Sequence, residues 1–213
     1  MLVAGLFTAA VCAQTPVVTQ AAVAVPAELA APVAAALAPD VVTVTIGSVK
    51  LDFWLVKALP LRAAPASGAA TWSDVPEGAL VGALRLTGSW SDIRNFTIHP
   101  GVYTLRYALQ PQNGDHMGIS PFREFLLPGP AADDTSIDPV GYDGAIALAK
   151  KVSRRAHPAS ISLDPPVASG NPLSTTTNDL GHQVVILSVP VAAAGQPSGA
   201  LTFGVVVEGT IEH

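Results

Sequence analysis

Apolar residues recur at every second position in several short segments of this chain, a period that is typical of β-strands with one buried face. The clearest segment is GVYTLRYALQP, residues 101–111, in which two tyrosines and two leucines share one face: Tyr103, Leu105, Tyr107 and Leu109. The alternate positions, with Arg106 among them, are predicted to meet solvent. The chain is therefore expected to fold around β-sheet.

Seven further segments have strand character and are separated by Pro, Gly and Asp residues that favour turns. The first two, VVTVTIG and VKLDFWLVK, meet at Gly47-Ser48 and predict a hairpin. The others are residues 78–88, 122–129, 159–166, 182–191 and 201–209.

One segment, YDGAIALAKKVSRRAHP (142–158), predicts a surface helix. Asp143 lies in its first turn, four basic residues crowd its last turns, and Pro158 is expected to end it. The predicted fold class is mainly β: an antiparallel β-sandwich of about eight strands, Ig-like or jelly-roll-like, with one surface α-helix.

The N-terminal residues indicate export. Residues 1–13, MLVAGLFTAAVCA, form an apolar run that ends in small residues and predict a signal peptide, although no Lys or Arg precedes the run. The alternative is a lipoprotein acylated at Cys12, for which Val11 is a poor fit. Residues 14–40 are rich in Ala and Pro and predict a spacer. Residues 41–213 predict a single β-sandwich domain, periplasmic or secreted.

Composition and motifs narrow the function classes. A formal charge of -5, with 13% charged residues, gives no basic surface for a nucleic-acid partner. No later segment reaches the ~18 apolar residues that a membrane span requires. The single cysteine lies in the predicted signal peptide, so disulfides and Cys-ligated zinc are not expected. Catalytic motifs such as Gly-x-Ser-x-Gly and His-Glu-x-x-His are absent from the sequence, which predicts a protein that is not an enzyme and needs no cofactor.

Residues 90–127, WSDIRNFTIHPGVYTLRYALQPQNGDHMGISPFREFLL, resemble an uncharacterised family of secreted bacterial β-rich proteins, a domain of unknown function. The shared features are a PGVYTLRY strand, a GDHMG turn and a REFLL strand, and the later SRRAHPASISLDPP is similar as well. That family has no known activity. The resemblance therefore implies export and a β-rich fold, and no chemistry.

The loop of residues 110–124 contains the first candidate site. Its polar side chains near a glycine-rich turn are expected to hold a small polar ligand or a sugar: Asp115, His116, Arg123 and Glu124. An alternative is a copper site, because His116 and Met117 offer an imidazole and a thioether, which suit Cu(I) outside the cytoplasm. His182 would complete that metal site only if the fold brings it near.

Two tryptophans form a second candidate. Trp72 and Trp90 occur in the similar stretches TWSDV and SWSDI. Flat aromatic faces stack on pyranose rings, so exposed and coplanar indoles beside a groove would indicate a carbohydrate-contacting module.

Together these observations predict an exported, non-enzymatic binding or structural module of the bacterial envelope, whose partner is an envelope protein or a glycan. The two alternatives are a periplasmic copper-binding protein that uses the His116-Met117 loop and a carbohydrate-contacting module that uses Trp72 and Trp90.

Overall fold

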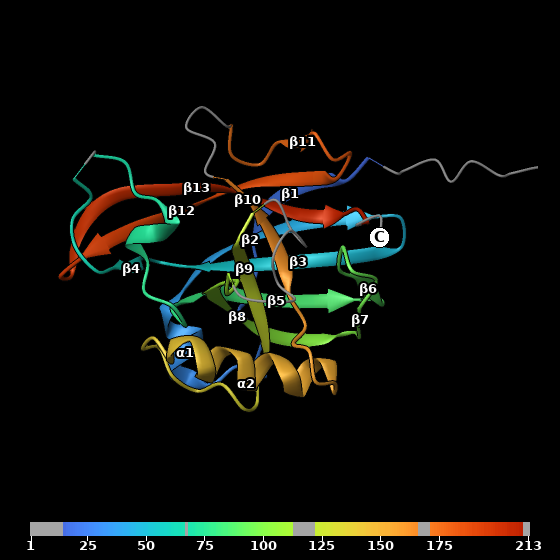
Figure 1. Cartoon of the computed structure of the whole chain (residues 1–213), viewed down its shortest axis with the longest axis horizontal. Coiled ribbons are helices and arrows are strands. Elements are labelled where there is room, and N and C mark those ends of the chain that lie inside the picture. The colour runs from blue at the N-terminus through green and yellow to red at the C-terminus, as the bar shows by residue number, and fades with distance from the viewer. Residues whose placement is uncertain (1–14, 67, 113–121, 166–170, 211–213) are drawn as a thin grey trace, which may run out of the picture.

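The computed structural model describes residues 15–66, 68–112, 122–165 and 171–210, and nearly half of these residues lie in β-strands. Ten strands form one continuous sheet in the order β1-β2-β3-β5-β8-β9-β10-β13-β12-β11, and β4 pairs with β12 outside that path (Figure 1). The sheet strands are β1 (Val17–Ala22), β2 (Leu37–Ile46), β3 (Val49–Val56), β4 (Leu59–Leu61), β5 (Leu80–Thr87), β8 (Gly101–Leu109), β9 (Glu124–Pro130), β10 (Ile161–Asp164), β11 (Thr175–Thr177), β12 (Gln183–Ala193) and β13 (Gln196–Glu208). A separate small hairpin consists of β6 (Trp90–Ser91) and β7 (Thr97–Ile98).

The sheet curls into a half-barrel instead of forming two separate layers (Figure 1). The short strand β10 joins two arms of the sheet, one that runs from β1 to β9 and one that runs from β13 to β11. It pairs antiparallel with β9 on one side and with β13 on the other. The mainly β class and the largely antiparallel pairing are confirmed, whereas the predicted sandwich of about eight strands is replaced by this continuous sheet. Strand patterns predict which face is buried, and they do not predict whether a corner strand links two arms.

One hydrophobic core lies between the two arms. Its main cluster takes residues from both, including Phe53 of β3 and Phe203 of β13. Trp72 lies in a short 3-10 helix (Trp72–Asp74) and contacts both arms. Its ring stacks on that of Tyr107 in β8, with ring centroids 4.7 Å apart, and makes an edge contact with Phe203 in β13, with ring centroids 5.0 Å apart. The half-barrel therefore behaves as one packing unit.

Residues that we predicted to be a spacer belong to this unit. Strand β1 pairs antiparallel with β2 over six residues, and helix α1 (Ala31–Ala36) follows it. Leu29, Val33 and Leu37 are buried in the main core. Pro32 does not prevent the helix, because proline in the first turn costs no backbone hydrogen bond.

The face of β8 that contains Arg106 is buried, although we predicted that it would be exposed to solvent. Arg106 itself has no exposed surface. Helix α2 (Gly141–Ser153) packs on this face through a cluster of small and apolar residues: Ala108, Leu127, Ala145 and Ala149. The helix ends at Ser153, before the predicted stop at Pro158, and its C-cap residue Arg154 has a left-handed φ of 54°. Within the described ranges, neither α-helix is long and apolar enough to cross a membrane.

The buried Arg106 is fully compensated. Its Nε and Nη2 donate to the two carboxylate oxygens of Asp134, each at 2.7 Å. Its remaining N–H groups donate to three backbone carbonyls of the surrounding loops: Gly78, Ser136 and Asp138. All five guanidinium donors are therefore used, and the ion pair fixes the chain between β9 and α2 over the sheet.

Candidate functional site

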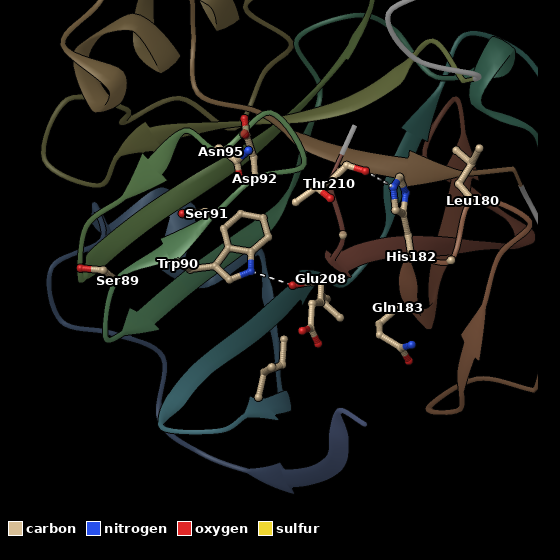
Figure 2. A pocket seen from close by; sticks show the side chains of 14 residues that line it. Ser89, Trp90, Ser91, Asp92, Asn95, Leu180, His182, Gln183, Glu208 and Thr210 are labelled. Atoms are coloured by element: carbon tan, nitrogen blue, oxygen red, sulfur yellow. Dashed lines mark hydrogen bonds between the residues drawn. The ribbon is translucent and has the colours of Figure 1, made fainter. Parts of the chain in front are cut away.

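A hollow of about 550 Å³ lies where the β6–β7 hairpin, the end of β13 and the turn before β12 meet (Figure 2). Trp90 and His182 both line it. In Figure 2 the indole of Trp90 and the imidazole of His182 lie on opposite sides of the segment that carries Glu208 and Thr210. The fold thus brings together two sequence-predicted candidates that are far apart in the chain.

The first wall is the β6–β7 hairpin, which two interactions fix in place. The indole Nε1 of Trp90 donates to the backbone carbonyl of Val207 at 2.7 Å, a buried contact across 117 residues. The Asp92 carboxylate accepts the backbone N–H groups of Arg94 and Phe96, each at 2.9 Å, as well as the Arg94 guanidinium. Asn95 takes a left-handed φ of 61°, which asparagine tolerates better than most residues. This wall is rigid, and its buried carboxylate is already paired.

The second wall is the turn 178–182. The side-chain oxygen of Asn178 accepts the N–H groups of Leu180 and His182 at 3.1 and 3.0 Å. Gly181 supplies the left-handed φ of 76° that closes the turn. The Asn178 amide donates in turn to Asp164 of β10, which links this wall to the corner strand.

Burial changes the acidity of the carboxyl group that Asn178 contacts. Burial raises the pKa of the Asp164 carboxyl above its ordinary value, and the Asn178 hydrogen bond and the nearby His182 oppose part of that rise. The Nε2 atom of His182 lies 3.2 Å from the carbonyl of Thr210. Because a carbonyl only accepts, Nε2 carries the proton in this contact.

Close packing of His182 depends on a glycine. A Cβ placed on Gly209 would overlap with the His182 ring. The missing side chain lets the imidazole lie against the chain that leaves β13, and His182 is 4% exposed as a result.

The remaining functional group of the hollow is Glu208, at the end of β13. It lies two positions after Val206, which packs in a small outer cluster with Ile93, Val184 and Ile186. Its Oε2 atom is buried and has no hydrogen-bond partner within the described residues. Gln183, the residue paired with Glu208 across the strands, directs its amide to Thr177 instead. None of the described residues that line the hollow is a Lys or an Arg, so this carboxylate has no charge partner there.

The tryptophan hypothesis fails on exposure. Trp72 is 2% exposed and lies in the core, and Trp90 is 8% exposed with its N–H bonded to the backbone. Neither indole presents an open face to a sugar ring. Trp90 still contributes to the hollow as part of its wall.

The predicted site in the loop 110–124 is described only at its ends. The guanidinium of Arg123 donates twice to the carbonyl of Gln110, at 2.9 and 3.0 Å, and the Arg123 backbone N–H donates to Glu124. These contacts tie the two ends of the loop together. Asp115, His116 and Met117 lie outside the described residues.

A metal site stays a prediction. Within the described ranges, no three His, Cys, Asp or Glu residues come together in a way that could hold a metal ion. His182 itself is engaged with Thr210, and the two other residues of the copper prediction are not described.

Sequence reasoning missed Glu208, Gln183 and Asn95. The signal for Glu208 is its place at the end of VVVEG, two positions after Val206, because residues two apart in a strand share a face. The folding of residues 89–95 over that face is what makes it part of a hollow.

Comparison with protein-family models, with curated proteins and with solved structures gives no match. The resemblance in residues 90–127 therefore stays a prediction.

Proposed function

We propose that this protein is an exported, non-enzymatic binding module of the bacterial envelope, and that the hollow beside Trp90 and His182 is its ligand site. The observation that carries the proposal is the buried Glu208 oxygen without a partner in the described residues, at a hollow of about 550 Å³. Such a volume is within the usual range for small-ligand sites. Four buried side-chain atoms have no partner among the described residues, and Oε2 of Glu208 is the one whose residue lines the hollow. Buried polar atoms are normally hydrogen-bonded, so this oxygen calls for an explanation.

Two features of the walls support binding over catalysis. The Asp92 carboxylate is occupied by Arg94 and by two backbone N–H groups. The His182 ring is held against the Thr210 carbonyl. Asp92 and His182, two groups that general acid–base chemistry could use, thus already serve the structure, whereas a preformed wall suits recognition.

Export is the second part of the proposal. It is supported by the apolar run of residues 1–13, which ends in small residues as a signal peptide does. The partner in the envelope would be a small molecule or a glycan presented to the hollow and bound without stacking on Trp72 or Trp90, whose rings are buried.

The proposal can be tested by nuclear magnetic resonance with three small probes of different chemistry: glucose, acetate and butylammonium. We expect at least one probe to shift the backbone amide signals of Asn95, Gly181 and Gln183 in a saturable manner. The variant Ser91→Phe would fill the hollow from the exposed side of β6 and should abolish the shifts. The variant Gln196→Phe, at the opposite end of the β12–β13 hairpin, is the matched control. If none of the three probes shifts these signals, the hollow is not a ligand site.

A further inference from the structure

The uncompensated carboxylate defines the chemistry of the ligand. We infer that the hollow binds a compact organic cation that carries N–H donors, such as a primary ammonium group, with Glu208 as its charge partner. This inference rests on the proposed function, because it names the ligand class of the same hollow.

The hydrogen bonds of the Glu208 carboxylate are incomplete within the described residues. An ionised carboxylate only accepts hydrogen bonds, so its Oε2 atom can be satisfied only by a donor. Within the described residues no donor reaches it, and the nearest cross-strand amide, that of Gln183, is directed to Thr177. A ligand N–H group would supply the missing bond, and a charged donor would make that bond stronger than a neutral one.

The charged residues that line the hollow also favour a cation. The hollow is lined by two carboxylates, those of Asp92 and Glu208, and by no Lys or Arg among its described residues. The Arg94 guanidinium neutralises Asp92 through an ion pair at 2.9 Å. Glu208 makes no ion pair within the described part of the chain. One negative charge therefore remains in the hollow, and it favours a cation over an anion or a neutral ligand.

The hollow also has apolar lining residues near the carboxylate. The indole of Trp90 donates its N–H to the carbonyl of Val207, the residue immediately before Glu208. This bond places the ring beside the carboxylate segment, as Figure 2 shows. Trp90, Ile46 and Leu180 line the hollow and offer apolar surface that the alkyl part of such a ligand can contact.

Other surfaces of the molecule do not favour a ligand in the same way. The buried Arg106–Asp134 pair is saturated by internal hydrogen bonds. The basic residues at the end of α2 are partly engaged, since Lys151 pairs with Asp133 and the Arg155 guanidinium lies over the Phe96 ring. The second hollow, of about 230 Å³ near β2 and β12, has no buried side-chain N or O atom without a partner among its described lining residues.

The test is a calorimetric titration of the protein with butylammonium chloride and, separately, with butanol, its neutral isostere. We expect saturable one-to-one binding of butylammonium, no binding of butanol, and at least a tenfold weaker affinity for butylammonium in Glu208→Gln. The variant Glu28→Gln removes the same charge from a surface pair with Arg85, outside the hollow, and should leave the affinity unchanged.

Three outcomes separate this inference from the proposed function. If glucose or acetate binds in the hollow and butylammonium does not, the hollow is a ligand site and the cation inference is wrong. If butylammonium binds equally well to Glu208→Gln, Glu208 is not its charge partner and the inference is again overturned. If neither these probes nor butylammonium binds, the proposed function fails together with the inference.

Discussion

Arg106 and Glu208 are both charged residues on strands of the same sheet, and their surroundings differ completely. Arg106 is wholly buried, and its five donors meet Asp134 and three backbone carbonyls. Glu208 is partly buried, and its Oε2 atom meets no donor within the described residues. A buried charge that is saturated by its own chain stabilises a unique arrangement of loops, whereas an unsaturated charge beside a hollow is available to a ligand.

The largest effect is expected at the saturated pair. Asp134→Ala leaves the Arg106 guanidinium buried without its counter-charge, and it also removes the acceptor of the Thr104 hydroxyl. The free energy of unfolding should fall by about 3–5 kcal/mol, as measured by urea denaturation. The double variant Arg106→Met with Asp134→Leu, which removes both charges, should recover much of that loss. A loss below about 1 kcal/mol in Asp134→Ala would mean that the pair is not the anchor of this loop.

The wall of the hollow offers a smaller effect. In Gly209→Ala the new methyl group overlaps with the His182 ring, so the free energy of unfolding should fall by about 1–3 kcal/mol. In a His182→Ala background the same change should cost much less. A double-mutant cycle measured by thermal denaturation checks this coupling, and purely additive effects would show that His182 does not pack against Gly209 in solution.

Glu208→Gln should change stability in the opposite direction. A neutral amide is less costly to bury than an unpartnered carboxylate, so the free energy of unfolding should rise by about 1 kcal/mol. The control Glu28→Gln removes an exposed charge and should change it by less than about 0.5 kcal/mol. If Glu208→Gln destabilises the protein, the carboxylate has a stabilising partner in the chain and the contrast with Arg106 no longer holds.

The smallest effect concerns pH. Burial raises the pKa of Asp164 in the folded protein, so in the window from its ordinary pKa of 3.8 up to the higher folded value the folded state binds more protons than the unfolded state. The contribution of Asp164 to stability is therefore present at low pH and decreases as pH rises through that window. Asp164→Asn should remove this decrease from the pH dependence of the urea midpoint. If stability decreases with pH to the same extent in the variant, a group other than Asp164 causes the decrease.

Much of the fold could be predicted from local patterns. The hairpin of β2 and β3 was predicted from the alternation on each side of Gly47-Ser48, and the structure confirms it through the pair Ile46 and Val49. Helix α2 was predicted from its charge distribution, and the structure confirms a helix there that ends at Ser153 instead of near Pro158. These features depend on residues close together in the sequence.

What the sequence did not predict depends on which segments cover which faces. The alternation in β8 correctly separates Tyr107 from Arg106, but it carries no information that α2 and the chain around Asp134 cover the second face. In the same way, Glu208 ends an apolar strand, and only the packing of the β6–β7 hairpin on Val207 encloses it. Long-range coverage decides whether a charged residue is solvated, saturated or left for a ligand.

The binding of a cation at Glu208 can be followed through the indole N–H signals in a nuclear magnetic resonance titration with butylammonium. The chain has three tryptophans, and each has a different place: Trp90 beside Glu208, Trp72 in the core, and Trp54 bonded to the carbonyl of Val23. We predict a saturable shift of the Trp90 signal alone, which is lost in Glu208→Gln and retained in Glu28→Gln. A Trp90 signal that does not move, or that moves equally in Glu208→Gln, would contradict the claim that Glu208 holds a cation in this hollow.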